Sequence, residues 1–207
     1  MTIEERAQSF REAYPQWPAA WPWLVEEKGE TVLYAVWVLG NDYRTRSPLY
    51  GAYPHGYLPR IQTLFPDRDE TNTLHAFAGS VPPGPYARCD VQGEVELPCS
   101  VVDLPNYFPE PAFSLVLADP PYSPQDALKY HVPMIDRRLA MEALGKITIP
   151  GGFLVWLDTC WPQHRKDTWR TTGRLFIQRS TNHRIRVATI FERRAGNGSG
   201  NGNGNGA

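Results

Sequence analysis

From Thr73 onward the chain consists of short apolar runs, each ending on glycine, proline or an acid. These runs predict strands at residues 73–77, 86–91, 99–105, 113–118 and 151–159. They are apolar almost throughout rather than alternating, which is typical of strands buried on both faces. Because helices or loops separate them, we expect a mainly parallel sheet covered on both faces.

Other segments carry helical or hairpin patterns. Residues 31–40 are apolar throughout, and periodicity leaves them open to either helix or strand. Residues 174–180 and 184–193 flank a short turn and predict a C-terminal antiparallel hairpin. Helices are predicted at residues 2–13, 58–65 and 125–147, the last interrupted near Pro133. The predicted fold class is therefore α/β.

The length of 207 residues fits one domain with a sizeable core. Residues 1–49 include irregularly alternating Pro and Trp, and we expect them to form an ordered extension packed on the core. Residues 50–194 are the predicted core domain. Residues 195–207 are a low-complexity Gly/Asn tail that we expect to be disordered.

Composition narrows the cellular setting. No apolar run approaches the length of a membrane-spanning helix, and the polar N-terminus lacks the apolar centre of a signal peptide. Cys89, Cys99 and Cys160 form no CxxC pair, so we expect neither a metal site nor a disulfide framework. These features predict a cytoplasmic protein without a membrane partner.

The net charge of −1 hides an asymmetry along the chain. Residues 165–194 contain nine Lys and Arg against two acids, Asp167 and Glu192. A solvated surface is one interpretation of such a run. The other is a basic surface for a polyanion such as nucleic acid.

Acids or glycine close four successive predicted strands: Ala78-Gly79-Ser80, Asp90, Asp103 and Asp119. Carboxyl ends of parallel strands meet at one edge of a sheet, where ligands bind. A glycine turn lets backbone approach a ligand, and an acid can accept hydrogen bonds from ribose hydroxyls. Taken singly, Gly79 is more simply explained as a turn residue, and Asp90 and Asp103 as Asx loop starts.

Together these motifs resemble one family. HAFAGS (75–80) is similar to an FxGxG cofactor loop, and LADPPYS (117–123) to a catalytic DPPY motif. YGAYPHGYLPRI (50–61) resembles an upstream segment that closes over the cofactor. The chain therefore resembles class I S-adenosylmethionine-dependent methyltransferases of the amino-methylating DPPY type, over residues 50–194.

The resemblance implies a Rossmann-like sheet, mainly parallel with a C-terminal antiparallel hairpin, and S-adenosylmethionine as cofactor. It implies cofactor-binding roles for Tyr50, Tyr53, His75, Phe77, Ala78, Gly79, Ser80, Asp90 and Asp103, and catalytic roles for Asp119, Pro120, Pro121 and Tyr122. The chain departs from the pattern at Val81, where the motif has its second glycine. Only about a dozen residues separate this motif from Asp90, so we expect a shortened first crossover.

The DPPY chemistry concerns an exocyclic amine whose lone pair is delocalised into a base. The Asp119 carboxylate and the Pro120 carbonyl are expected to accept the amine hydrogens, the prolines to hold these acceptors rigid, and Tyr122 to stack on the base. We expect nucleic-acid contacts from Arg165, Lys166, Arg170, Asn182, His183 and Arg184. No oligomeric state is predicted.

Three functions follow, in order of preference. The first is methylation of adenine N6 in DNA, because Asp at the first motif position leans towards adenine in this family. The second is methylation of an RNA base, at adenine N6 or guanine N2. The third is a non-catalytic nucleotide- or partner-binding module, which the departure at Val81 motivates.

Overall fold

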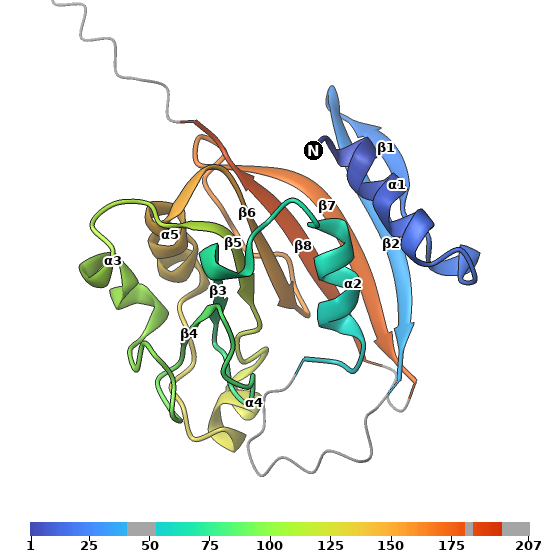
Figure 1. The fold of residues 1–207 in the computed structure, drawn as a ribbon. Coiled ribbons are helices and arrows are strands. Elements are labelled where there is room, and N and C mark those ends of the chain that lie inside the picture. The colour runs from blue at the N-terminus through green and yellow to red at the C-terminus, as the bar shows by residue number, and fades with distance from the viewer. Residues whose placement is uncertain (41–52, 181–183, 196–207) are drawn as a thin grey trace, which may run out of the picture.

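The computed structural model describes residues 1–40, 53–180 and 184–195. Within these residues, eight strands form one sheet in the order β1-β2-β7-β8-β6-β5-β3-β4 (Figure 1). The strands are β1 Trp23–Glu27, β2 Glu30–Leu39, β3 Thr73–Ala76, β4 Ala87–Cys89, β5 Phe113–Ala118, β6 Thr148–Asp158, β7 Trp169–Arg179 and β8 Ile185–Arg193. The α-helices are α1 Ile3–Ala13, α2 Tyr57–Leu64, α3 Leu104–Tyr107, α4 Pro124–Lys129 and α5 Arg137–Ile147.

The predicted fold class is confirmed. Strands β4, β3, β5 and β6 are parallel neighbours, and β8 runs antiparallel between β6 and β7. Residues 77–86, which link β3 to β4, contain no helix, so the first crossover is as short as predicted. Helices α4 and α5 are separate, in agreement with the predicted interruption near Pro133.

The ambiguous segment 31–40 is a strand. In β2, Leu33, Ala35, Trp37 and Leu39 are buried, whereas Val36 and Val38 between them are exposed. Alternate side chains of a strand point to opposite faces, so over residues 35–39 this strand buries one face only. Strand β2 pairs in parallel with β7, which joins the N-terminal segment to the same sheet as the rest of the chain. The predicted boundary between residues 49 and 50 lies outside the described residues.

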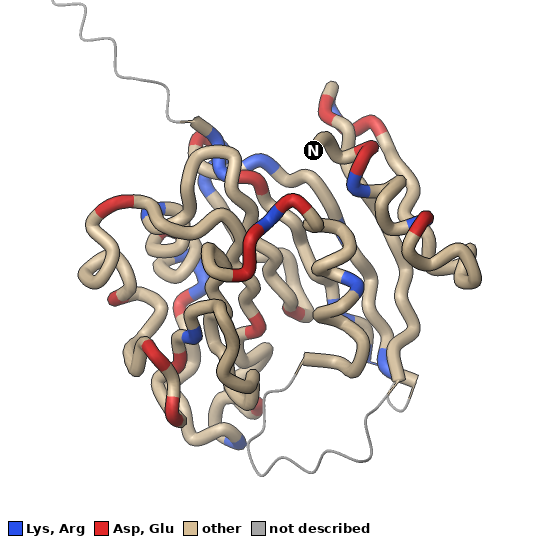
Figure 2. Tube along the Cα trace, viewed as in Figure 1, with Lys and Arg blue, Asp and Glu red and all other residues tan. Residues whose placement is uncertain are grey.

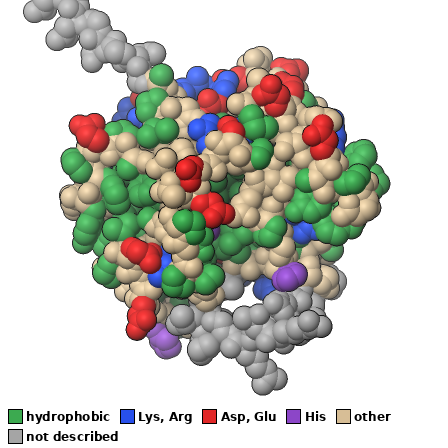
Figure 3. Space-filling model, in the orientation of Figure 1, with side chains coloured by type: hydrophobic (Ala, Val, Ile, Leu, Met, Phe, Trp, Pro, Cys, Tyr) green, Lys and Arg blue, Asp and Glu red, His purple; other side chains and the backbone are tan. Residues whose placement is uncertain are grey.

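Two hydrophobic cores cover the two faces of the sheet. Helices α1 and α2 pack over one face, where Phe10, Trp37 and Ile61 are fully buried. Helices α3 and α5 cover the other face, on a core that includes Leu144 and Trp156. Hydrophobic side chains also reach the surface over α3 (Figure 3), where Tyr107 is 55% exposed.

The predicted strand at residues 99–105 was wrong. Val101–Asp103 form a 3₁₀-helix that leads directly into α3. The Ser100 side chain accepts a hydrogen bond from the Val102 N–H, and Pro105 lacks the N–H that a sheet ladder would need. Asp103 therefore does not close a strand. Among the described residues, no helix has the length and hydrophobicity needed to cross a membrane.

A buried arginine joins α1 to α2 and to the sheet. The Arg6 guanidinium donates to the Leu64 carbonyl at the C-terminal end of α2, at 2.9 Å, and to both carboxylate oxygens of Asp67, at 2.6 and 2.9 Å. It also lies over the rings of Phe65 and Phe153, 4.7 and 4.6 Å from their centroids. One side chain thus satisfies a helix end and packs against the aromatic core.

We expect Arg6→Ala to lower the free energy of unfolding by about 3 kcal/mol, because it leaves a helix-end carbonyl and a partly buried carboxylate unpaired. Urea unfolding measures the change. Gln8→Ala, at an exposed position of the same helix, is the control and should stay within about 0.5 kcal/mol of the wild type. Equal stability of the two variants would contradict this role of Arg6.

Candidate active site at the carboxyl ends of the strands

A cavity of about 540 Å³ lies at the carboxyl ends of β3, β4 and β5. After β3 the chain forms β4 at the edge of the sheet, whereas after β5 it forms β6 on the opposite side of β5. The strand order therefore reverses between β3 and β5. Such a reversal is the usual ligand site of an open α/β sheet. The lining residues are Phe77, Gly79, Asp90–Gly93, Cys99–Val102, Asp119, Pro121, Lys129–Asp136, Leu139 and Ala140.

The loop after β3 is held in an unusual conformation. Phe77 and Gly79 both have positive φ, 59° and 53°. That conformation strains a bulky residue such as Phe77 by roughly 1–3 kcal/mol. The Asp90 carboxylate accepts hydrogen bonds from the backbone N–H groups of Gly79, at 2.8 Å, and Gln92, at 3.0 Å. Asp90 therefore fixes this loop against the end of β4.

The structure brings only some of the predicted cofactor residues to the cavity. Phe77, Gly79 and Asp90 line it, whereas His75, Ala78, Ser80 and Asp103 do not. Tyr53 also lies outside the lining, and Tyr50 is outside the described residues. His75 pairs with Leu117, which belongs to the core under α2. The His75 side chain therefore points to that face of the sheet, away from the cavity.

Sequence reasoning missed one wall of the cavity, residues 129–136. The Gln92 side chain donates to the His131 carbonyl at 2.9 Å, which links this wall to the segment after β4. The one available signal was the break in helical pattern near Pro133. Because the helical pattern is interrupted after the Asp-Pro-Pro-Tyr segment, a non-helical segment lies between α4 and α5 and can line a neighbouring site.

Asp119 follows β5 directly and reaches the cavity. Burial raises the pKa of its carboxyl to about 7, and the negative charge of Asp158 adds to this rise. The Tyr122 hydroxyl, which donates to Oδ1 of Asp119, and the positive charge of Arg186 act in the opposite direction. The carboxyl thus changes protonation near neutral pH, as a general acid or base requires.

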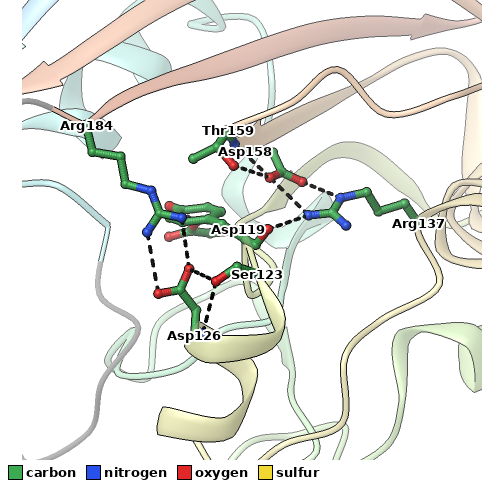
Figure 4. A network of polar contacts seen from close by, with 8 residues as sticks. Asp119, Ser123, Asp126, Arg137, Asp158, Thr159 and Arg184 are labelled. Carbon is green, nitrogen blue, oxygen red and sulfur yellow. Dashed lines mark hydrogen bonds and ion pairs between the residues drawn. The ribbon is translucent and has the colours of Figure 1, made fainter.

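An internal ion pair holds the segment after β5 in place (Figure 4). Arg137, the first residue of α5, donates to both oxygens of fully buried Asp158, at 2.8 and 3.2 Å. The same guanidinium donates to the Tyr122 carbonyl at 3.0 Å. Asp158 also accepts from the Trp156 indole, at 3.1 Å, and the Thr159 N–H, at 2.7 Å. Its charge is therefore well satisfied, and Tyr122 is anchored through Arg137.

Two further arginines contact the Tyr122 ring. The guanidinium carbons of Arg184 and Arg186 lie 5.2 and 5.1 Å from the ring centroid. Arg184 also pairs with Asp126 in the first turn of α4, at 3.1 Å (Figure 4). The ring that was predicted as a stacking platform is thus in contact with cationic groups in this conformation.

The predicted nucleic-acid contacts fall at two ends of the sheet. Arg184 lies beside Tyr122, while Asn182 and His183 are outside the described residues. Arg170 forms an ion pair with Glu192. Glu192 is the cross-strand neighbour of Phe153, which lies five residues before Asp158, at the site end of β6. That separation corresponds to roughly 17 Å of strand.

Arg165 and Lys166, just before β7, lie towards the same far end, where Figure 2 shows several basic segments near the start of the C-terminal tail. Arg165 forms an ion pair with Asp167 at 2.6 Å. In the part of the chain that the structure describes, no group of three or more His, Cys, Asp or Glu side chains is arranged to hold a metal ion.

No protein-family model and no curated protein matches the sequence. Three solved structures are distantly similar in fold. TrmN from Thermus thermophilus has 13% identity and a TM-score of 0.47, over 69% of this chain and 50% of that one. An rRNA methylase from Streptococcus thermophilus has 12% identity and a TM-score of 0.40, over 62% and 90%. SMU.776, complexed with SAH, has 10% identity and a TM-score of 0.43, over 91% and 65%.

The chain thus spans half the length of the TrmN structure. The fold and the site define an α/β protein with a cavity at the strand ends and, beside it, a carboxyl whose pKa is raised to about 7. The function proposed below rests on this geometry.

We expect Arg137→Met to lower the free energy of unfolding by about 3–5 kcal/mol, because it leaves the Asp158 charge buried and unpaired. The double variant Arg137→Met/Asp158→Asn removes that charge and should recover most of the loss. Urea unfolding of both variants tests the pairing. Arg138→Met, at an exposed neighbouring position, is the matched control. Equal losses in the single and double variants would contradict the pairing.

The raised pKa of Asp119 also predicts how stability depends on pH. Between the ordinary value of 3.8 and about 7, the folded protein holds a proton that the unfolded chain has lost. This contribution to the free energy of unfolding is therefore full below pH 3.8 and is lost as the pH rises to about 7. Above pH 7 we expect Asp119→Asn to be more stable than the wild type, by on the order of a few kcal/mol.

Thermal unfolding of the wild type and Asp119→Asn from pH 4 to 8 measures this difference. Glu142→Gln, at an exposed position of α5, is the acid-to-amide control and should keep a constant offset from the wild type. A constant offset for Asp119→Asn as well would refute the raised pKa.

Proposed function

We propose that the protein transfers a methyl group from S-adenosylmethionine to the exocyclic amine of a nucleobase, with adenine N6 in DNA as the first candidate. The observation that carries this proposal is the position of Asp119. It borders a cavity of cofactor size, of about 540 Å³, and begins the rigid Asp-Pro-Pro-Tyr segment that Arg137 anchors.

The cavity residues fit such a cofactor. Asp90 uses both carboxylate oxygens to hold backbone N–H groups, and each oxygen has a further lone pair for a ribose hydroxyl. Val101, Val102 and Leu139 supply apolar surface for an adenine ring. Gly79 lets the loop backbone approach a ligand closely. Asp103, His75 and Tyr53 do not line the cavity, and the proposal assigns them no cofactor contact.

When bound, S-adenosylmethionine supplies an electrophilic methyl group on its sulfonium. The Asp119 carboxylate and the Pro120 carbonyl accept hydrogen bonds from the amine, which makes its lone pair available for attack. Pro120 and Pro121 fix the backbone that carries these acceptors. With a pKa of about 7, Asp119 can also take up the proton that the amine loses.

Nucleic-acid contacts divide into two regions under this proposal. Arg184, at the end of the hairpin next to Tyr122, is placed for a phosphate flanking the target base. A base that stacks on Tyr122 displaces Arg184 from the ring. Arg165, Lys166 and Arg170 lie towards the far end of the sheet and are proposed to contact a more distant part of a long nucleic acid.

The test offers the purified protein tritiated S-adenosylmethionine with genomic DNA, total RNA and ribosomal subunits side by side. Mass spectrometry of the digested nucleosides then identifies the methylated base. We expect N6-methyladenine in DNA. Methylation confined to RNA would show that RNA, not DNA, is the substrate. Absence of any methyl transfer despite cofactor binding would favour a non-catalytic binding protein.

Asp119→Asn should reduce methyl transfer at least 100-fold. The neutral amide lacks the negative charge that stabilises the amine as it becomes positive in the transition state. Cofactor affinity, measured by calorimetry, should change by no more than a few-fold. Wild-type activity should rise with pH through about 7, as the Asp119 carboxylate forms. The Glu142→Gln control should be fully active. Normal turnover by Asp119→Asn would exclude this mechanism.

A further inference from the structure

Arg186 is a buried charge that the structure leaves incompletely satisfied. Its side chain projects from β8 and the residue is only 8% exposed. Among the described residues, its Nε and Nη1 atoms have no hydrogen-bond partner. Burial of unpaired guanidinium donors is costly, so a protein that retains them is expected to pair them with a ligand.

Arg186 lies on the face of the sheet opposite the cavity, next to the Asp-Pro-Pro-Tyr segment. It pairs across the sheet with Ile177, which belongs to the core under α1 and α2, so the two side chains share that face. Arg186 does not line the cavity, whose helical wall comes from α5 on the other face. It nevertheless lies over the Tyr122 ring, and its charge lowers the pKa of Asp119.

Other unsatisfied polar atoms gather on the same side. The hydroxyls of Tyr53 and Tyr57 and Nδ1 of His75 are buried without partners among the described residues. The Tyr53 ring stacks on the Tyr57 ring, with centroids 5.3 Å apart, and lies 5.9 Å from the ring of His75, which is on β3 beside the end of β5. This face of the sheet therefore carries several polar groups without partners beside the end of β5.

We propose that Arg186 donates a hydrogen bond to a ring nitrogen beside the target amine and thereby reads the base. This inference rests on the proposed function and adds the residue that reads the base. Arginine has only donors, so its partner must be an acceptor.

The three nucleobases that carry an exocyclic amine differ in what flanks that amine. Adenine N6 has an acceptor on each side, N1 and N7. Cytosine N4 has one acceptor, N3, and a C–H group on the other side. Guanine N2 lies between an acceptor, N3, and the N1–H donor, which would oppose a guanidinium. A donor-only group is satisfied on either side of adenine but on only one side of the other two bases.

The experiment uses base analogues that lack one acceptor. Random-sequence oligonucleotides, of DNA or RNA according to which accepts methyl groups, carry adenine, 7-deazaadenine or 1-deazaadenine at every adenine position. The wild type should lose about 10- to 100-fold in kcat/KM on one of the two analogues, the size expected for a charge-assisted hydrogen bond.

Arg186→Met should lose a similar factor on adenine and then treat adenine and that analogue alike, whereas Arg186→Lys should keep part of the discrimination. Arg138→Met is the matched control and should behave as the wild type. Cofactor affinity and melting temperature should not fall in Arg186→Met, since the variant removes an unsatisfied buried charge outside the cavity.

Each outcome decides the matter. If the wild type methylates all three oligonucleotides equally, or if Arg186→Met keeps the wild-type preference, Arg186 does not read the base. The first of these outcomes needs no variant, so it stands even if Arg186→Met fails to fold. If the wild type methylates none of the oligonucleotides, the proposed function itself fails, and the inference about Arg186 fails with it.

Discussion

The ion pair between Arg137 and Asp158 is the interaction on which the geometry of the site depends. It joins the start of α5 to the end of β6 and, through the Tyr122 carbonyl, to the segment after β5. Asp158 is fully buried, and four hydrogen bonds of 3.2 Å or shorter satisfy its carboxylate. The prolines make the segment stiff, and this pair determines where the stiff segment lies.

Around this anchor, several groups are held in states that do not favour stability. Phe77 has a strained backbone, the Asp119 carboxyl is desolvated, and Arg186 has unpaired donors. All three surround the carboxyl end of β5, whereas the two hydrophobic cores supply stabilising contacts elsewhere. A strained residue, a desolvated carboxyl and unpaired donors at one strand end are typical of a site that binds a ligand.

Much of the fold could be predicted because its signals are local. The apolar run of β5, the terminal hairpin and the interruption near Pro133 follow from residue order alone. Residues 31–40 were ambiguous, since their pairing with β1 and β7 makes them a strand. Residues 99–105 were predicted wrongly, because the capping Ser100 and the backbone of Pro105 outweighed apolar content.

For the site, the sequence by itself determined the chemistry: an acid, two prolines and a tyrosine after a buried strand, with Asp90 following another strand. Only the tertiary structure decided which residues share the cavity. It excluded Asp103 and His75, added residues 129–136, and separated Arg184 from Arg170 along the hairpin. The physical reason is that strand order and register set which side chains meet, and neither is encoded in any short stretch of residues.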